Sequence, residues 1–590
     1  MRRLQKAAAC ILCSSMAITL SACGSSGNTG NQADESTSFT MWIYSGSDSS
    51  YYTDYKDNPV IQYALNKTFG EEEKTVDIEF WVPPAGSQTD SFSTMMTSGD
   101  YPDILDGSIS ASPKTMYEDG IILDLTDYVE QYMPNYYAYL EANQDVKSNA
   151  VIEVDGEQKI LTIRGANDDY PYQFAGPQYR RDWIVKYGTN PVNGEKFSGG
   201  YTDSENPDSW EDDVVFPSGG TDPVYISDWE WMFEIFEMAQ EDLGITDSYC
   251  TSVYYPGFTW NGGIASSFGG GVPVWYVNSD NQVQFGGDSE QFRAYLQCLN
   301  TWYEKEWLDS AFNERTSDIF YEIDSVSVRQ GKVGLWVGIE SQLGGRMDVG
   351  DEYTSGICSY GCAYPINDIY GTEECKNIIP DCLFNTSLTG TAYYITKAAS
   401  EKDIPVICEF FDYFYSEEGA LLRTMGLNKE QVEEIDNDFY KKWALEEGAY
   451  YIAEDGRYAY ADVIAGDSGN LKDAVTATKI PGITMVKDVD RGYEVTYESS
   501  LKKWIQYENT AFFQGTAVTS NMSNEDAKLT DDIRNKILEY LTVNAADYIK
   551  GKKDPFSDSD WENWCTMLKK YNYQKASDIY QPYADAYSFK

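Results

Sequence analysis

Histidine is absent from all 590 residues of this sequence. Its absence excludes Ser-His-Asp and Cys-His catalysis, histidine general bases and most zinc or copper sites. Carboxylates remain abundant, because the chain holds 95 aspartate and glutamate residues. Two carboxylates held roughly 5–10 Å apart can hydrolyse a glycosidic bond without histidine. The composition therefore leaves paired-carboxylate chemistry open.

Aromatic side chains at the ends of strand-like segments are a second set of candidates. Trp42 and Tyr44 end the apolar segment 39–44, and Trp81 lies near the end of the alternating segment 75–82. Ligands of open α/β sheets bind just beyond the carboxyl ends of the strands. Most of the 15 tryptophans and 48 tyrosines are expected in the core or on ordinary surface. These three instead occupy positions from which a ring can reach a ligand.

A glycine-rich stretch supplies two further candidates, Trp260 and Asn261, which precede Gly262 and Gly263. Glycine has no β-carbon, so it lets the backbone approach a ligand closely. We therefore predict that Trp260 and Asn261 contact a ligand from a loop.

Cysteines indicate neither a zinc site nor a defined disulfide pattern. After the first 23 residues they are Cys250, Cys298, Cys358, Cys362, Cys375, Cys382, Cys408 and Cys565. An even number permits disulfides outside the cytoplasm, first of all within 358–382, but free buried thiols are equally compatible. Asp-rich loops are present, yet none has the EF-hand spacing for calcium. We expect no metal and no other cofactor.

The N-terminus has the pattern of an export signal. Arg2, Arg3 and Lys6 precede a run of 14 apolar or small residues, which is shorter than the roughly 20 residues needed to span a bilayer. The next residues, Leu-Ser-Ala-Cys at 20–23, resemble the lipobox of bacterial lipoproteins. The resemblance implies acylation of Cys23 and cleavage before it. Polar, small residues at 24–38 then predict a flexible tether.

The charge balance excludes nucleic acid as a partner. The formal net charge is −51, and nucleic-acid binding requires a cationic surface. The same balance argues against docking on anionic lipid through a basic patch. Since 42% of the residues are hydrophobic and 15% are aromatic, the chain can bury large cores, and its length predicts two or more lobes.

Alternation of strand and helix patterns predicts the α/β fold class. Strands at 39–44 and 75–82 flank a helix expected at 59–69, which is a βαβ unit with a parallel sheet. The Asp155-Gly156 pair predicts a hairpin, and Ser227 to Glu230 form the S-x-x-E pattern of a capping box at a helix start. Further helices are expected at 291–307, 404–415 and 530–550, and a polar surface insertion at 188–223.

Six segments resemble, in order, the extracellular solute-binding proteins of family 1, the carbohydrate-importer type, and in particular its long-chain lipoprotein subgroup from Gram-positive bacteria. They are SGDYPDI at 98–104, GIILDLTDY at 120–128, YRRDW at 179–183, GKVGLW at 331–336, FFDYFYSEEGALLRTMG at 410–426 and the C-terminal stretch 561–587. Each segment alone is a weak signal, but six in the expected order are strong together.

The resemblance implies a two-lobed, periplasmic-binding-protein-like fold with a hinge and an inter-lobe ligand cleft. The expected division is a signal peptide at 1–22, a lipidated tether at 23–38, lobe 1 at 39–165, lobe 2 at 166–357, a return to lobe 1 at 358–426 and C-terminal helices of lobe 2 at 427–590. The implied partners are a carbohydrate and the membrane subunits of an ABC importer. We expect a monomer anchored at the extracytoplasmic face of the cell membrane.

The resemblance also places candidate ligand contacts. Asp100 lies in a loop that borders the family's cleft, and Arg180 matches the arginine of its R-x-D-W-L motif. Asp182 is expected to be the structural partner of that arginine or a helix cap. Trp336 lies where family members often place an aromatic platform, and Glu340 follows it. A sugar has apolar C–H faces and a rim of hydroxyls, so aromatic rings with a few polar groups suit it.

Two other functions are compatible with the sequence. The same fold can bind a peptide or another polar solute. A surface glycosidase would use paired carboxylates, but no segment resembles the acid or nucleophile motif of a glycosidase. We therefore expect a binding protein and not an enzyme.

Overall fold

The computed structural model describes residues within the unit Ser36–Lys590. The described residues are 36–43, 51–84, 87–107, 112–143, 146–147, 150–168, 175–197, 214–253, 264–269, 274–278, 280–314, 327–328, 330–339, 359–378, 392–435, 437–465, 470–490, 500, 502–504 and 522–586.

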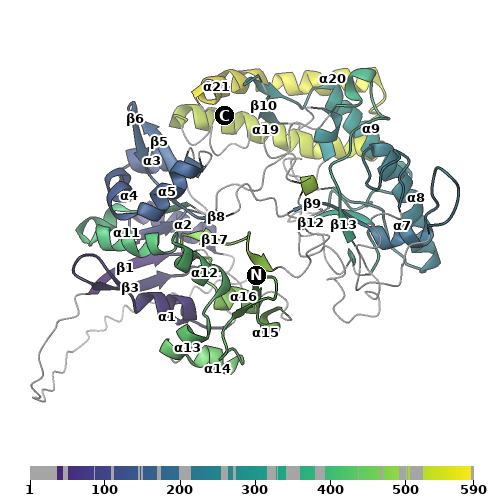
Figure 1. The fold of residues 1–590 in the computed structure, drawn as a ribbon. Coiled ribbons are helices and arrows are strands. Elements are labelled where there is room, and N and C mark those ends of the chain that lie inside the picture. The colour runs from purple at the N-terminus through teal and green to yellow at the C-terminus, as the bar shows by residue number, and fades with distance from the viewer. Residues whose placement is uncertain are drawn as a thin grey trace, which may run out of the picture. The chain divides into compact units, whose positions relative to one another are not determined.

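The main sheet of this unit has six strands (Figure 1). In spatial order they are β2 (Thr68–Phe69), β3 (Lys74–Trp81), β1 (Ser36–Trp42), β4 (Ile104–Asp106), β14 (Ala392–Ile395) and β7 (Ile163–Arg164). β1 pairs in parallel with β3 and β4, whereas β14 is antiparallel to both β4 and β7. Strands β3, β1, β4 and β7 therefore all run in the same direction and end at the same edge.

Alternation of side chains gives the sheet two buried faces. Phe39 and Met41 of β1 point to one face, where they pack with helices in a large core. Trp42 points to the other face, where it packs with Leu105 of β4 and Tyr394 of β14. Because successive strand residues face opposite sides, this division follows directly from the predicted period of two.

Helices from both halves of the chain cover the first face. They are α1 (Pro59–Leu65), α4 (Thr126–Tyr132), α5 (Pro134–Ala142) and α11 (Ile404–Tyr413). α1 begins after Asn58, whose Oδ1 accepts from the backbone nitrogens of Val60 at 2.9 Å and Ile61 at 3.2 Å. Pro59 follows at the first helical position, where no backbone donor is needed.

The opposite face is covered by α2 (Gln88–Ser98), α3 (Pro113–Glu118) and the hairpin β5 (Val151–Val154) and β6 (Glu157–Ile160). Asp155 and Gly156 at the hairpin turn have φ of 54° and 82°. Positive φ at both positions matches the type I′ turn that an Asp-Gly pair favours, so the predicted hairpin is confirmed.

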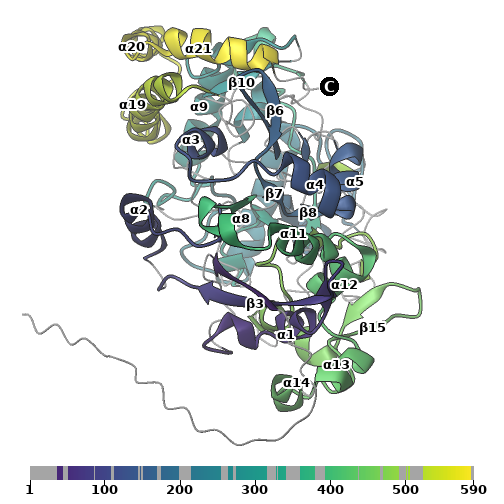
Figure 2. The same ribbon diagram turned by 90° about the vertical axis from the view of Figure 1, so that its left-hand side faces the viewer.

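A second core surrounds the sheet β12 (Leu335–Ile339), β9 (Ala175–Arg180) and β13 (Ser359–Gly361). Its helices are α7 (Arg181–Tyr187), α8 (Ile226–Asp242), α9 (Glu290–Glu304), α19 (Asn524–Ile549), α20 (Asp558–Lys570) and α21 (Tyr573–Ala586). α19 and α21, coloured towards yellow, lie side by side in both ribbon views (Figures 1 and 2).

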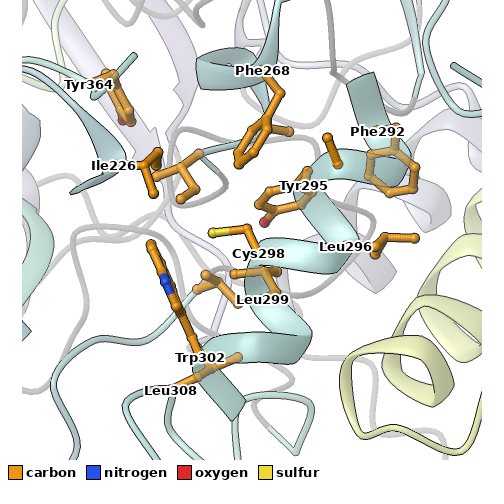
Figure 3. Close-up of a cluster of buried hydrophobic side chains, with 14 of the residues drawn as sticks. Ile226, Phe268, Phe292, Tyr295, Leu296, Cys298, Leu299, Trp302, Leu308 and Tyr364 are labelled. Atoms are coloured by element: carbon orange, nitrogen blue, oxygen red, sulfur yellow. The ribbon is translucent and has the colours of Figure 1, made fainter. Parts of the chain in front are cut away.

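Helix α9 lies at the centre of this second core. Figure 3 shows Tyr295, Cys298 and Trp302 on α9, packed with Ile226 of α8 and Phe268 of the 3-10 helix η5 (Ile264–Phe268). All five side chains are buried. The predicted helix 291–307 is therefore present, one residue earlier at its start and three residues shorter at its end.

The remaining elements are short. They are the helices α12 (Glu417–Met425), α13 (Lys429–Ile435), α14 (Asp438–Lys442), α15 (Asp462–Ala465) and α16 (Asn470–Val475), the 3-10 helices η2 (Tyr55–Asp57), η7 (Glu373–Cys375) and η8 (Lys397–Glu401), and the strands β8 (Ala166–Asn167), β10 (Trp275–Val277), β11 (Val283–Phe285), β15 (Tyr450–Ile452), β16 (Tyr458–Tyr460), β17 (Ile483–Thr484) and β18 (Val489–Asp490).

Two local predictions were wrong. The helix expected at 59–69 ends at Leu65, because Thr68 and Phe69 pair with β3 as the strand β2. Ser227 does not cap α8: the helix begins at Ile226, and the Asp228 carboxylate caps it by accepting from the backbone nitrogen of Tyr225 at 3.0 Å. The serine instead donates its hydroxyl to Asp368.

The expected lobe boundaries do not coincide with the limits of the two cores. Leu427, Tyr440 and Ile480 belong to the core that contains β1, although 427–590 was assigned to the other lobe. Tyr360 packs in the second core, although 358–426 was assigned to lobe 1. β1 also begins at Ser36, inside the segment expected to be a tether. The division of the chain into lobes therefore remains a prediction.

Cysteines in the described part of the chain are free. They are Cys250, Cys298, Cys362, Cys375, Cys408 and Cys565, whereas Cys358 and Cys382 lie outside the described residues. Within the described ranges, no group of three potential ligands forms a metal site. No helix among these residues is both long enough and apolar enough to cross a membrane.

Candidate functional site

Four strands that run in the same direction end at one edge of the six-stranded sheet, and the antiparallel β14 lies between two of them, β4 and β7. Their last residues are Trp81 of β3, Trp42 of β1, Asp106 of β4 and Arg164 of β7. Ligands of open α/β sheets bind beyond this edge. We call these four residues the strand-end set. Two of them, Trp42 and Trp81, were predicted from the sequence.

Trp42 and Trp81 are register partners on adjacent strands, so both side chains extend from the same face. Trp42 is buried, with 4% of its surface exposed, and its ring lies 6.3 Å from that of Phe92 on α2. Trp81 is only partly buried, and its Nε1 donates to Glu79 Oε1 at 3.1 Å. Trp81 is therefore the tryptophan of the pair whose ring a ligand can reach, while Trp42 supports the face beneath it.

Arg164 and Asp106 are the polar members of the strand-end set. Arg164 pairs with Ala392, which lies on the same face as Trp42, and its side chain is partly buried. Asp106 is 3% exposed and is paired with Tyr393 of β14. A guanidinium offers a planar fork of donors, and a carboxylate offers acceptors. Asp106 follows Leu105, which lies on the face of Trp42, so the buried Asp106 side chain extends from the opposite face. Arg164 is therefore the member of the pair that can donate to ligand hydroxyls beside Trp81.

Gly107 keeps the chain after Asp106 close to the neighbouring strand. Its backbone nitrogen donates to the Ala392 oxygen at 2.6 Å. A β-carbon at this position would lie 2.4 Å from the ring of Tyr394 and 2.8 Å from the Ala392 oxygen. Only glycine fits here, so the chain follows a tightly constrained path as it leaves β4.

The sequence reasoning missed Asp106, Gly107 and Arg164. β4 has three residues and β7 has two, which is too short for an alternating pattern to be recognised. A weak signal existed in the sequence Ile-Leu-Asp-Gly at 104–107, an apolar pair followed by an acid and a glycine.

Arg180 lies at the end of β9 in the second core, where Asp182 holds it. Arg180 Nε donates to Asp182 Oδ1 at 2.8 Å, and its Nη2 donates to Oδ2 at 2.5 Å. The guanidinium carbon also lies 4.1 Å from the ring centroid of Trp183. The expectation that Asp182 is the structural partner of this arginine is confirmed. Both side chains are almost completely buried, so the pair is a structural element of the second core in this conformation.

Trp336 is fully buried in this structure. It lies in β12, paired with Gln178 of β9, and packs with Val328 and Val333. A ring with 0% exposed surface cannot contact a ligand in this conformation. Its predicted role as an aromatic platform therefore stays a prediction.

Asp100 is exposed and does not join the strand-end set. It follows Gly99, whose φ of 73° ends α2, and it precedes β4 instead of following it. The predicted turn is present, but the residue is not at the carboxyl end of a strand. Its role as a ligand contact stays a prediction.

The other predicted site residues lie outside the described part of the chain. They are Cys23, Tyr44, Trp260, Asn261 and Glu340. Their assignments remain predictions.

A separate groove lies at the opposite end of the six-stranded sheet. Its volume is about 720 Å³, and its lining includes Tyr117, Asp124, Tyr128 and Lys397. Lys397 follows β14, whose last residue pairs with the first residue of β4, so this groove is at the edge where the parallel strands begin. Burial opposes ionisation of Asp124, but hydrogen bonds from Thr126 and Lys159 outweigh it and lower its pKa. The groove is therefore not part of the strand-end set.

Comparison with known proteins identifies the architecture. No family model matches the chain, and no curated protein sequence matches it. Among solved structures, it is similar to an HMO-binding, ABC-transporter-associated solute-binding protein from Bifidobacterium longum infantis, with 12% identity over 94% of this chain and 99% of that one and a TM-score of 0.63. The chain has the fold of the two-lobed solute-binding proteins. This fold confirms the predicted α/β class.

Two further solved structures with this fold are carbohydrate-binding proteins. The Streptococcus pneumoniae ABC-transporter substrate-binding protein FusA, in complex with kestose, is 14% identical over 93% of this chain and 99% of that one, with a TM-score of 0.62. The alginate-binding protein AlgQ2, without calcium ion, is 15% identical over 94% of this chain and 100% of that one, with a TM-score of 0.58. At such identities the likeness shows the fold alone.

Proposed function

We propose that this chain is an extracytoplasmic binding protein, anchored through Cys23, that captures an oligosaccharide and delivers it to an ABC importer. It is a carrier and not an enzyme. The observation that carries this proposal is the strand-end set. Two tryptophans, an arginine and an aspartate end four strands that run in the same direction, at the edge where this fold class binds ligands.

The chemistry of the strand-end set suits a sugar. The ring of Trp81 is accessible and supplies a flat apolar surface for the C–H face of a pyranose or furanose. Arg164, which extends from the same face, supplies donors for the hydroxyl rim. Solved structures with the same fold include proteins that bind kestose and alginate, which supports a carbohydrate over a peptide.

Titration calorimetry on the unit Ser36–Lys590 tests the proposal. An oligosaccharide panel and a panel of short peptides should be titrated separately, and the recovered sugar should be analysed by chromatography. We expect binding to one class of oligosaccharide and full recovery of intact sugar. Binding to peptides alone would reject the carbohydrate, and recovery of shorter sugars would show a glycosidase.

Arg164 offers a sharper test of where the sugar binds. Its backbone nitrogen donates to the Tyr136 hydroxyl at 3.0 Å and its backbone oxygen accepts from the Tyr415 hydroxyl. These bonds do not use the side chain, so Arg164→Met retains them. We expect Arg164→Met to weaken sugar binding at least about tenfold while the melting temperature changes little. Unchanged affinity would remove the strand-end set as the binding site.

A further inference from the structure

The hairpin formed by β15 and β16 carries apolar side chains at an exposed edge. In their small sheet the strand order is β15, β16, β18, so β15 is an outer strand. Tyr451 and Ile452 of β15 are 52% and 65% exposed. In the described part of the chain, they are the only exposed large apolar residues that are consecutive in the sequence. Single exposed apolar residues are ordinary, whereas an adjacent pair on an outer strand can mark a contact surface.

The base of this hairpin is firmly held. Tyr450 packs against Tyr458, with 5.7 Å between the ring centroids, and both contact a small core that includes residues of α12. The Tyr460 hydroxyl donates to the Thr424 oxygen at 2.8 Å. Figure 2 shows the hairpin at β15 extending outwards from α12 and α13. A fixed support therefore presents the exposed residues, which lowers the entropic cost of binding to them.

The main chain of β15 directs hydrogen-bonding groups to this edge. The Ala453 nitrogen donates to the Arg457 oxygen at 2.8 Å, so the groups of Ala453 face the second strand of the hairpin. Main-chain groups of an antiparallel strand alternate in direction, so those of Ile452 point away from β16. Since side chains also alternate, Tyr451 and Ile452 lie on opposite faces. A segment that lies along the edge can contact both side chains and the main chain of Ile452.

Negative charge flanks the exposed pair. Residues 446–462 hold five acidic residues and one basic residue. Arg457 is paired with Asp455, and Glu447 is paired with Lys429 at 2.7 Å. Three exposed carboxylates remain, and none of them forms an ion pair with another described residue: Glu446, Glu454 and Asp462.

This charge pattern decides between the possible occupants of the edge. A second copy of the chain would bring two sets of these carboxylates together, and an anionic membrane would repel them, because like charges at a contact oppose binding. A protein segment with lysine or arginine beside apolar residues matches both features. Its charges attract the carboxylates, and its apolar side chains cover Tyr451 and Ile452. Addition of an extended segment to a sheet edge is a general mode of peptide recognition.

We propose that the β15 edge is a docking site for an extended, basic segment of a partner protein. Tyr451 and Ile452 supply the apolar contact, and the main chain of Ile452 supplies hydrogen bonds. The three carboxylates attract lysine or arginine side chains of the partner. The β15 edge belongs to a different sheet from the strand-end set, so the inference does not depend on which ligand the chain captures.

Photo-cross-linking with the full chain tests this docking site. The photoreactive amino acid p-benzoylphenylalanine should replace Tyr451 in cells that naturally make the protein, and cross-linked peptides should be identified by mass spectrometry. Phe556, between α19 and α20, is the matched control position, because it is 53% exposed. We expect position 451 to link to one segment of another protein that carries lysine or arginine. The yield should be at least about fivefold higher than from position 556.

Neutral variants test the role of the charges. Glu446→Gln, Glu454→Gln and Asp462→Asn in one chain should lower the cross-link from position 451 at least about threefold, while the melting temperature changes little because these side chains are exposed. The matched control removes three exposed carboxylates of α19 and α20, through Glu525→Gln, Asp532→Asn and Glu562→Gln.

Every other outcome would overturn the docking site. These outcomes are the absence of a link from position 451, equal yields from positions 451 and 556, and equal yields in the two triple variants. A link to lipid, to a second copy of this chain or to a segment without lysine or arginine would also contradict the proposed partner.

Discussion

Trp42 and Trp81 face the same side of the sheet as register partners on adjacent strands, yet one ring is buried and the other is partly exposed. The two rings differ in exposure because Phe92 of α2 lies against Trp42. Trp81 ends β3, and the only strand beyond β3 in the sheet is the two-residue strand β2. Two residues of the same type, at equivalent positions, thus have different roles. Trp42 stabilises the fold, and Trp81 is available to a ligand.

Trp81→Ala should weaken sugar binding roughly tenfold to a hundredfold, because a ring face that stacks on a sugar contributes about 1.5–3 kcal/mol. The melting temperature should fall by only a few degrees, since the ring is partly exposed. Calorimetry and thermal unfolding measure the two effects. Trp231→Ala is the matched control, because Trp231 is also partly buried but packs with Phe216 in the second core. Equal loss of binding in both variants would contradict the assignment.

Asp182→Ala should destabilise the protein by about 3–5 kcal/mol, because it leaves the buried Arg180 guanidinium without its partner. The double variant Arg180→Met with Asp182→Ala should be more stable than Asp182→Ala alone. Urea unfolding of the two single variants and the double variant measures this coupling. Additive effects of the two changes would show that the pair contributes nothing beyond its separate side chains.

Gly176→Ala should lower stability by about 1–3 kcal/mol through overpacking. A β-carbon at Gly176 would lie 2.3 Å from Nε1 of Trp504, whose indole nitrogen donates to the Cys362 oxygen at 3.1 Å. A rigid, hydrogen-bonded ring cannot move aside easily. Gly220→Ala is the control, since its β-carbon would have no neighbour closer than 3.7 Å. Equal melting temperatures for the two variants would contradict the close packing of Trp504.

Asp412 should make stability depend on pH. Burial raises its pKa, although hydrogen bonds from Tyr136 and Asn135 partly oppose this effect. A carboxyl with a raised folded-state pKa contributes stability below its unfolded pKa of about 4, and this contribution is lost as the pH rises through the folded pKa. The free energy of unfolding of Asp412→Asn, relative to the natural protein, should therefore increase from pH 4 to pH 7. Urea unfolding across this range measures the trend, and a decrease would reverse the assigned direction.

The elements that could be predicted are those whose pattern lies within a few consecutive residues. Strands β1 and β3 are long enough to show alternation, and the Asp155-Gly156 turn has its own backbone signature. The tryptophans at their ends were therefore found. β4 and β7 are too short for such a pattern, and β14, which lies between them, comes from a distant part of the chain. Asp106 and Arg164 could not be recognised until the pairing was known.

The burial of individual side chains also could not be predicted from the sequence. Trp336 follows Gly334 in one of the segments that suggested a ligand contact, but its full burial depends on packing with Val328 and Val333. The Arg180–Asp182 pair was foreseen because only two positions separate its members. Spacing along the chain thus predicted the contact between Arg180 and Asp182. It could not predict whether the ring of Trp336 is exposed to solvent.

The strand β14 has a consequence for the synthesis of the protein. It separates β4 from β7, and it follows Arg164 by roughly 230 residues, which a ribosome takes about 10–45 s to translate at 5–20 residues per second. Until Ala392 to Ile395 have been made, Asp106 and Arg164 have no common sheet to hold them. A growing chain therefore presents its tryptophans early and completes the strand-end set late. A product truncated before Ala392 therefore lacks the strand that joins β4 to β7.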